Sequence, residues 1–230
     1  MKYLKLVIQI VCFIVFLIIV YLLFRMFLIY VLYQPKGASV FTFKDDNIFL
    51  KSSNTCNNVM QDFTMCIPEG FSLKEDFGKG DTVTYTDHSG NLSIIASVDK
   101  TSIKKYIKEN NVGVDVNQFL DKYQFENNTD VLKFLAENQD KKFNLLSNLS
   151  DVKEYKVIWE YAQNTFPMGD VYFIEGDYFG FLIIKGNNYR FYLDYDGKVY
   201  KVSFSNSSLA NPIFTKDNVL EYVKSIQFID

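Results

Sequence analysis

The feature that most constrains this chain is an apolar stretch near its N-terminus, LVIQIVCFIVFLIIVYLLF, at residues 6–24. These nineteen residues include one polar side chain, Gln9, and no charge. As a helix rising about 1.5 Å per residue, the stretch is roughly 28 Å long, close to the thickness of the hydrocarbon core of a bilayer. The sequence therefore predicts a transmembrane helix, with residues 1–36 forming the anchor and its flank.

The anchor is expected to stay attached to the mature protein. Apolar residues resume after Arg25 as MFLIYVLY, whereas a secretory signal peptide has a shorter apolar core followed by a small-residue cleavage site. This pattern favours an uncleaved signal anchor; the alternative is cleavage near the small residues Gly37, Ala38 and Ser39. Cys12 lies inside the apolar run rather than after it, so we interpret it as a buried thiol and not as a lipidation site.

Positive charges flank the apolar stretch on both sides, with Lys2 and Lys5 before it and Arg25, Lys36 and Lys44 after it. The lysines beside the amino terminus favour a cytoplasmic N-terminus. We therefore predict a single-pass protein of the cell membrane whose C-terminal domain lies outside the cytoplasm. Arg25 allows two interpretations: either the span ends just before it, or the span is longer and its side chain extends to a headgroup.

The rest of the chain is acidic. Residues 1–36 hold four of the 24 basic residues and none of the 27 acidic ones, which leaves 20 basic and 27 acidic residues and a formal charge of −7. No basic cluster is present to bind a phosphate backbone, so we expect no nucleic-acid partner. Residues 59–230 are long enough to bury the core of one domain, and residues 37–58 are predicted to be a linker.

The clearest secondary structure is a hairpin at residues 189–205, YRFYLDYDGKVYKVSFS. Asp196 and Gly197 form a two-residue turn, which pairs residue 195 with residue 198 and fixes the register. One side of the hairpin is expected to be core and the other to face solvent. The core side carries Leu193 with Tyr200, Phe191 with Val202, and Tyr189 with Phe204; the solvent side carries Tyr192 with Lys201, and Arg190 with Ser203.

Further strands are expected on both sides of a helical middle. A second hairpin turns at Gly176 and Asp177, and EYKVIWEYA at residues 154–162 alternates well enough to be a strand. Together these segments predict a meander of about five antiparallel strands between residues 154 and 205. Another hairpin is predicted at residues 82–98.

Three helices are predicted from their caps and apolar stripes. Thr215 can cap a final helix, a second helix begins after Asp115, and a third begins at Asn128 or Thr129. The final helix carries a single apolar stripe of Val219, Leu220, Val223 and Ile226. The order of strands, helices, strands and helix predicts an α+β fold, an antiparallel sheet with helices packed on it.

The segments DFTMCIPEGFSL, TVTYTDHSGNLSIIASV and FTKDNVLEYVKSIQF, with the helices and meander between them, resemble the PsbP-like α/β/α sandwich. The resemblance covers residues 60–229, and its local motif is an Ile-Pro-Glu-Gly turn followed by an aromatic at residues 67–71. The group includes the extrinsic subunit of photosystem II and bacterial envelope lipoproteins, so the resemblance implies a non-catalytic binding or accessory domain. The chain departs from simple members in its insert at residues 101–150 and its anchor. No functional residue is carried over, since a fold does not fix a function.

Cys56 and Cys66 lie ten residues apart. Their even count and the predicted export favour a disulfide, which would contribute about 2.7 kcal/mol by closing a loop of about eleven residues. The alternative is two free thiols. The spacing is not Cys-x-x-Cys, which argues against a redox-active pair.

Side chains that could carry chemistry are few. His88, the one histidine, lies in the turn DHSGN, where neither a Ser-His-Asp triad nor a zinc site is expected. We interpret the carboxylate pairs as surface charge or turn chemistry. These pairs are Asp45 with Asp46, Glu75 with Asp76, and Asp194 with Asp196. No glycine-rich phosphate loop or dinucleotide fingerprint occurs, so we predict no catalytic residue, metal or cofactor.

The sequence as a whole favours a membrane-anchored accessory or interaction domain outside the cytoplasm. Its predicted partners are membrane lipid, through the N-terminal helix, and other envelope or membrane proteins. Trp159, Tyr192 and Tyr195, expected on the solvent side of the sheet, are the candidate binding residues; plain sheet packing is their alternative role. Two other functions stay open: an anchored hydrolase of cell-surface polymer using paired carboxylates, and a sensor of a small ligand or lipid.

Overall fold

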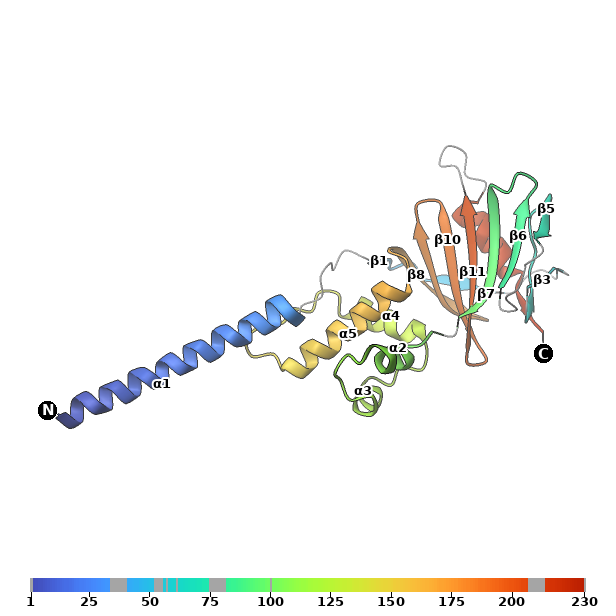
Figure 1. Ribbon diagram of the computed structural model, residues 1–230. Helices are drawn as coiled ribbons and strands as arrows, with labels where there is room; N and C mark the ends of the chain where they lie inside the picture. The colour runs from blue at the N-terminus through green and yellow to red at the C-terminus, as the bar shows by residue number, and fades with distance from the viewer. Residues whose placement is uncertain are drawn as a thin grey trace.

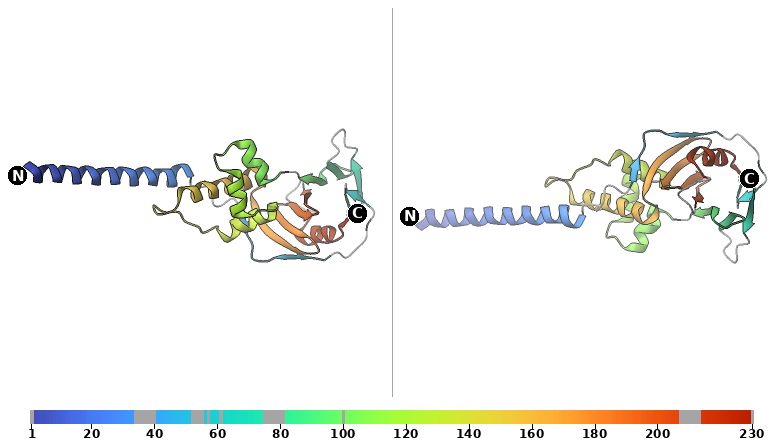
Figure 2. Two further views of the ribbon diagram at one scale, coloured as in Figure 1. Left: turned by 90° about the horizontal axis from the view of Figure 1, so that it is seen from below. Right: turned by 90° about the horizontal axis from the view of Figure 1, so that it is seen from above.

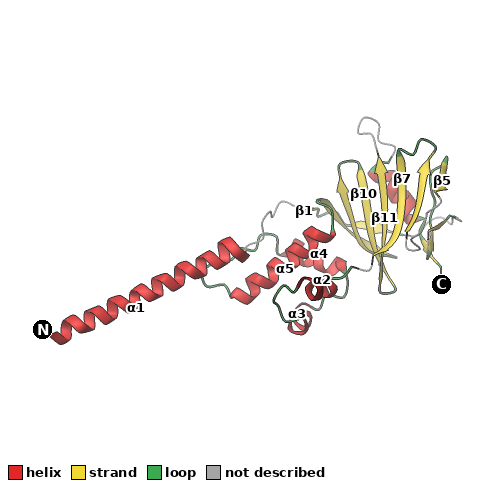
Figure 3. Ribbon diagram, viewed as in Figure 1, coloured by secondary structure: helices red, strands yellow, loops and turns green. Residues whose placement is uncertain are grey.

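The computed structural model describes residues 2–33, 41–51, 56, 58–60, 62–74, 82–99, 101–206 and 214–229. The molecule is elongated: a long N-terminal helix leads to a group of helices, and a twisted sheet lies beyond them (Figure 1). Helices and strands are largely segregated along this axis, as the colouring by secondary structure shows (Figure 3). The chain is therefore α+β, as predicted.

The N-terminal helix α1 (Lys2–Phe27) continues into a short π-helix, η1 (Leu28–Tyr33). Within these two elements Lys5–Val31 has the length and apolar composition needed to cross a membrane. The apolar side chains of α1 are mostly exposed, whereas Ile29 of η1 is fully buried in the domain core. The segment after Arg25 thus begins to belong to the folded domain.

Four helices follow the first strands: α2 (Ile103–Asn110), α3 (Val116–Tyr123), α4 (Asn128–Glu137) and α5 (Leu149–Thr165). The predicted starts are confirmed for α3, whose N-cap is Asp115, and for α4, which begins at Asn128 after the N-cap Asn127. Each cap side chain accepts hydrogen bonds from backbone N–H groups of the first turn, which the helix itself cannot satisfy.

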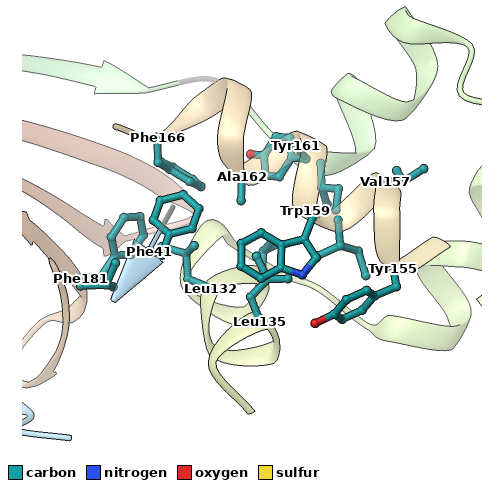
Figure 4. Packing of buried hydrophobic residues seen from close by; sticks show 14 of the residues in the cluster. Phe41, Leu132, Leu135, Tyr155, Val157, Trp159, Tyr161, Ala162, Phe166 and Phe181 are labelled. Atoms are coloured by element: carbon teal, nitrogen blue, oxygen red, sulfur yellow. The ribbon is translucent and has the colours of Figure 1, made fainter. Parts of the chain in front are cut away.

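The strand predicted at residues 154–162 is wrong, because this segment lies in α5. Its short run of alternating apolar residues also fits a helix buried over much of its surface. Val152, Tyr155 and Trp159, spaced three and four residues apart, are all buried in the helical core. Figure 4 shows Tyr155 and Trp159 with their neighbours in this core. Asn148 caps the start of α5. The apolar faces of α5 pack against η1 and α4.

The main sheet has nine strands among the described residues, in the order β1-β8-β9-β10-β11-β7-β6-β5, with β2 also pairing with β8. Its strands are β1 (Phe41–Phe43), β2 (Ile48–Leu50), β5 (Phe71–Lys74), β6 (Thr82–Asp87), β7 (Leu92–Asp99), β8 (Gly169–Gly176), β9 (Phe179–Lys185), β10 (Asn188–Tyr195) and β11 (Lys198–Asn206). The predicted meander is therefore four strands, β8 to β11. The hairpin predicted at residues 82–98 is confirmed as β6 and β7.

The register predicted for the last hairpin is confirmed: Tyr195 pairs with Lys198 and Leu193 with Tyr200. The turn residues Asp196 and Gly197 both have positive φ, 48° and 68°, as a type I′ turn requires. Asparagine, aspartate and glycine tolerate this backbone best, so the local sequence was sufficient to fix the pairing.

Two further expectations need correction. The sheet is mixed rather than antiparallel, because β1 and β2 both pair in parallel with β8. These strands lie within residues 37–58, so part of the predicted linker belongs to the sheet. There it forms hydrogen bonds with N–H and C=O groups of β8 that would otherwise be unpaired at the edge of the sheet. The described residues of that segment are 41–51, 56 and 58.

The sheet contributes to two hydrophobic cores, one on each face. At β1 and β8 to β11 one face shares a core with the helices α2 to α5, and the other face packs on α6 (Lys216–Lys224) and on a small sheet. Figure 2 shows α6, in red, on the opposite side of the sheet from the end of the chain that carries α1. The cap predicted at Thr215 is confirmed, and Val219 and Val223 are fully buried. The side of the β10–β11 hairpin expected to face solvent is instead partly core, since Tyr192 packs on Phe166 and Phe181.

The small sheet is built from β3 (Val59–Met60), β4 (Phe63–Thr64) and β12 (Gln227–Phe228), in the order β12-β4-β3. It joins a segment near the start of the domain to the last described strand. Cys56 and Cys66 flank the β3–β4 hairpin and are paired in a disulfide, with their Cα atoms 5.0 Å apart.

Candidate functional site

The three aromatic residues predicted for binding lie in different environments. Trp159 is 2 % exposed and lies in α5, stacked on Phe41 with ring centroids 6.1 Å apart. Tyr192 is 1 % exposed, on the face of the sheet that the helices cover. Their expected position on a solvent-facing side of the sheet is therefore wrong. Tyr195 is 38 % exposed and is the one of the three on an open surface, but it lies on the same side of β10 as Leu193, opposite to Tyr192, and so not on the side expected to face solvent.

Tyr195 lines an open groove of about 700 Å3 beside the β10–β11 turn. The groove is lined by Asp62, Tyr195, Asp196, Lys198, Tyr200, Phe228 and Ile229. Phe228 belongs to β12, next to the C-terminus, and Figures 1 and 2 show this end of the domain facing away from α1. We call this feature the distal groove.

The floor of the distal groove is aromatic. The rings of Tyr195 and Phe228 are stacked, 3.8 Å apart and inclined by 6°. Phe228 also contacts Tyr200 and Phe63, at centroid distances of 4.8 and 5.7 Å. This packing fixes the Tyr195 ring while leaving more than a third of the residue exposed, a geometry suited to contact with another apolar or aromatic group.

One wall of the distal groove carries an ion pair. Lys198 Nζ lies 3.0 Å from Asp62 Oδ2, and the hydroxyl of Tyr200 donates to the same oxygen at 3.1 Å. The hydrogen bonds from Lys198 and Tyr200 lower the pKa of Asp62, and the bond to Asp62 raises the pKa of Lys198. Both charged groups are about half exposed, so they stay available to a partner.

The small sheet supports the Asp62 side of the groove. The amide of Ile229 donates to Asp62 O at 2.8 Å, and the amide of Met65 donates to Asn58 O at 3.0 Å. The amide of Cys66 donates to Ser225 Oγ at 2.7 Å, next to the end of α6. The disulfide, these hydrogen bonds and β12 together hold two distant segments of the chain at one place.

The other residues considered for chemistry do not gather at the groove. His88 is exposed in the β6–β7 turn, where Ser89 and the amide of Leu92 donate to Asp87. Asp45 and Asp46 are exposed, and Glu75 and Asp76 lie outside the described residues. Among the residues that the structure describes, no group of three or more His, Cys, Asp or Glu side chains is placed to hold a metal ion.

Asp194 lies two residues from Asp196, but its side chain faces the helices instead of the distal groove. The Thr129 hydroxyl, at the start of α4, donates to Asp194 Oδ2, and Oδ1 is buried without a hydrogen-bond partner among the described residues. Burial is the main reason why the pKa of Asp194 is raised to about 6. The hydrogen bond from Thr129 lowers this pKa, and the negative charge of nearby Asp130 raises it further. This carboxyl group therefore joins the sheet to the helical group.

Sequence reasoning did not identify Asp62, Tyr200 or Phe228 as site residues. Lys198 and Tyr200 could be placed beside Tyr195 from the hairpin register alone. Asp62 lies 136 residues before Lys198 and 138 before Tyr200, and the chain carries no local signal for contacts of this separation. The two-residue strand β12 is likewise too short to be recognised by its pattern.

The chain matches no protein-family model, no curated protein and no solved structure. The resemblance to the PsbP-like sandwich therefore stays a prediction.

Proposed function

We propose that this protein is a single-pass membrane protein whose acidic domain lies outside the cytoplasm and binds other envelope or membrane proteins through the distal groove. The observation that carries the proposal is that the groove is lined by residues next to the C-terminus, and Figure 1 shows this part of the chain at the end of the domain away from α1. A helix able to cross a membrane at one end, and an open aromatic surface at the other, suit a module that extends away from the bilayer.

The composition of the distal groove supports a protein partner. Its centre is the stacked pair Tyr195 and Phe228, and its edge carries the exposed ion pair of Lys198 and Asp62. Protein-binding surfaces commonly combine aromatic anchors at the centre with a polar rim. The fixed Tyr195 ring would lose little conformational entropy on binding.

The groove offers less support for a carboxylate-based hydrolase. Such an enzyme needs a general acid whose pKa is raised, together with a second carboxylate across a cleft. In the distal groove the pKa of Asp62 is lowered instead, by its hydrogen bonds to Lys198 and Tyr200. Asp194, whose pKa is raised, faces Thr129 on the other side of the sheet.

The proposed location is supported by the disulfide between Cys56 and Cys66, since such bonds persist in oxidising compartments. It is tested by treating intact cells with a membrane-impermeant reductant and then a large maleimide, and reading the gel mobility of the full-length protein. We expect a shift that appears only after reduction. A shift that requires lysis would place the domain inside the cell and overturn this part of the proposal.

The proposed binding surface is tested by site-specific photocrosslinking in living cells. A photoreactive phenylalanine analogue at position 195 is compared with the same analogue at Leu73, which is 58 % exposed on the edge strand β5 and lies outside the groove. We expect discrete protein adducts from position 195 that weaken in a Lys198→Ala background. Equal adducts from both positions, or none from position 195, would contradict a binding role for the groove.

A further inference from the structure

The loop that connects α4 to α5 lies beside the end of α1. Figure 1 and both views of Figure 2 show this loop next to the last turns of the long helix. Arg25 fixes the contact, because its Nη2 donates to the carbonyl oxygen of Ser147 at 2.5 Å. The burial of Ile29 in the core that also contains α5 holds the following segment in place.

Arg25 also determines which part of α1 the α4–α5 loop lies beside. Arg25 Nη1 donates to the hydroxyl of Tyr21, four residues earlier, at 3.1 Å. Side chains on a helix point back toward its N-terminus, so the guanidinium lies level with the last turn of the apolar stretch rather than beyond it. Ser147 is therefore level with the end of the apolar run 6–24, inside the longer segment Lys5–Val31 that is able to span a membrane.

The tip of the loop presents an apolar side chain. Leu146 is 92 % exposed, more than the other large apolar residues of the domain that the structure describes. A tight turn holds it in this position. The amide of Ser147 donates to Asn144 O at 3.0 Å, the amide of Leu146 donates to Asn144 Oδ1 at 2.9 Å, and the amide of Asn144 donates to Ser147 Oγ at 2.9 Å. The exposure of Leu146 thus belongs to an ordered turn.

Two basic residues accompany this leucine. Lys141 and Lys142 are exposed in the same loop, although the domain as a whole is acidic. The Lys141 ammonium lies 5.6 Å from the ring centre of Phe143 and 5.5 Å from that of Tyr155. An exposed leucine and two exposed lysines in one loop, near the last turns of a helix able to span a membrane, match the chemistry of the membrane interface, which accepts apolar side chains near acyl chains and ammonium groups near phosphates.

We infer that residues 141–147 form a second contact with the lipid surface. Leu146 enters the interface beside α1, and Lys141 and Lys142 face lipid phosphates. The inference rests on the proposed membrane anchor. Its consequence is mechanical: one helix allows the domain to rotate and tilt, whereas a second contact on the same side of the domain fixes its direction and keeps the distal groove away from the bilayer.

The test uses the full-length protein with Cys12→Ala, reconstituted in vesicles of phosphatidylcholine and phosphatidylglycerol with its disulfide intact. An environment-sensitive NBD fluorophore is attached at Leu146→Cys, at Leu73→Cys as an exposed leucine far from α1, or at Ile18→Cys within α1. We expect the label at position 146 to show a blue-shifted emission, quenching by lipid-borne doxyl groups and loss of quenching by aqueous iodide. The label at position 73 should behave as in water.

The three positions separate the possible failures. If position 18 is quenched by doxyl lipid while position 146 behaves like position 73, the second contact is overturned and the anchor stands. If position 18 is also in water, the anchor itself fails. A blue shift at position 146 without doxyl quenching would indicate burial in protein and would also overturn the inference. In the Lys141→Glu, Lys142→Glu variant, we expect a loss of doxyl quenching at position 146.

Discussion

Replacing Asp194 with asparagine tests how one buried carboxyl group affects the joint between the helices and the sheet. Asp194 lies on β10, accepts a hydrogen bond from Thr129 of α4, and leaves one carboxyl oxygen buried without a partner among the described residues. Asparagine keeps the shape and an acceptor for the Thr129 hydroxyl but cannot ionise. It also puts an amide NH2 where Oδ1 lies, at a cost that does not change with pH, so the pH-dependent part of the difference reports the charged form alone.

The sign of the effect follows from the direction of the pKa change. Burial raises the pKa of Asp194 from 3.8 to about 6 in the folded protein, so folding favours the protonated form. Its contribution to stability is complete below pH 3.8 and is lost as the pH rises through about 6. At about 1.4 kcal/mol per pH unit the loss is about 3 kcal/mol, or about 2 kcal/mol when screening by solvent at this partly exposed group is included.

We therefore expect Asp194→Asn to gain about 2 kcal/mol in the free energy of unfolding relative to the natural protein between about pH 4 and about pH 7.5. The assay is urea unfolding of the full-length protein in detergent micelles. It is followed by the fluorescence of Trp159, the one tryptophan in the chain and 2 % exposed in the helical core. Asp196→Asn, which removes an exposed carboxylate from the turn nearby, is the matched control. A difference between Asp194→Asn and the natural protein that stays constant with pH would refute the reasoning.

Two further substitutions test how the early part of the chain is held. A Cβ at Gly176, whose φ is +120°, would lie 2.1 Å from the carbonyl oxygen of Leu50, whereas a Cβ at Gly186 would meet no atom within 4 Å. Gly176→Ala is therefore expected to cost more than about 3 kcal/mol in urea unfolding, and Gly186→Ala only about 1 kcal/mol for its left-handed backbone; equal costs would contradict the close approach of β2 to β8. Replacing both Cys56 and Cys66 with serine should lower the free energy of unfolding by about 2.7 kcal/mol in the same assay, and an unchanged value would show that the bond does not constrain the chain.

Features governed by neighbouring residues could be predicted from the sequence. The apolar length of residues 6–24 requires a helix able to cross a membrane. The Asp196–Gly197 turn fixes the register of β10 with β11, because its backbone accepts few other residues. Asp115 and Thr215 start their helices, because their side chains satisfy backbone donors within the same turn.

Tertiary structure decided whatever depends on partners far away in the chain. Residues 154–162 had an apolar pattern that fits a strand or a helix, and the buried surface offered by η1 and α4 selects the helix α5. The same helices cover Tyr192, which an isolated hairpin would leave exposed. Local propensity amounts to fractions of a kcal/mol per residue, so the burial of a large side chain, at about 1.5–3 kcal/mol, overrides it.

The candidate site divides in the same way. The hairpin register places Tyr195, Lys198 and Tyr200 together, and with Asp196 they make up four of the seven residues that line the distal groove. Asp62 and Phe228 lie beside these residues only because β12 pairs with β4. This pairing brings together a segment near the start of the domain's sequence and a segment near its end. Such a pairing depends on the shape of the whole core, and no local rule of turns, caps or periodicity can specify it.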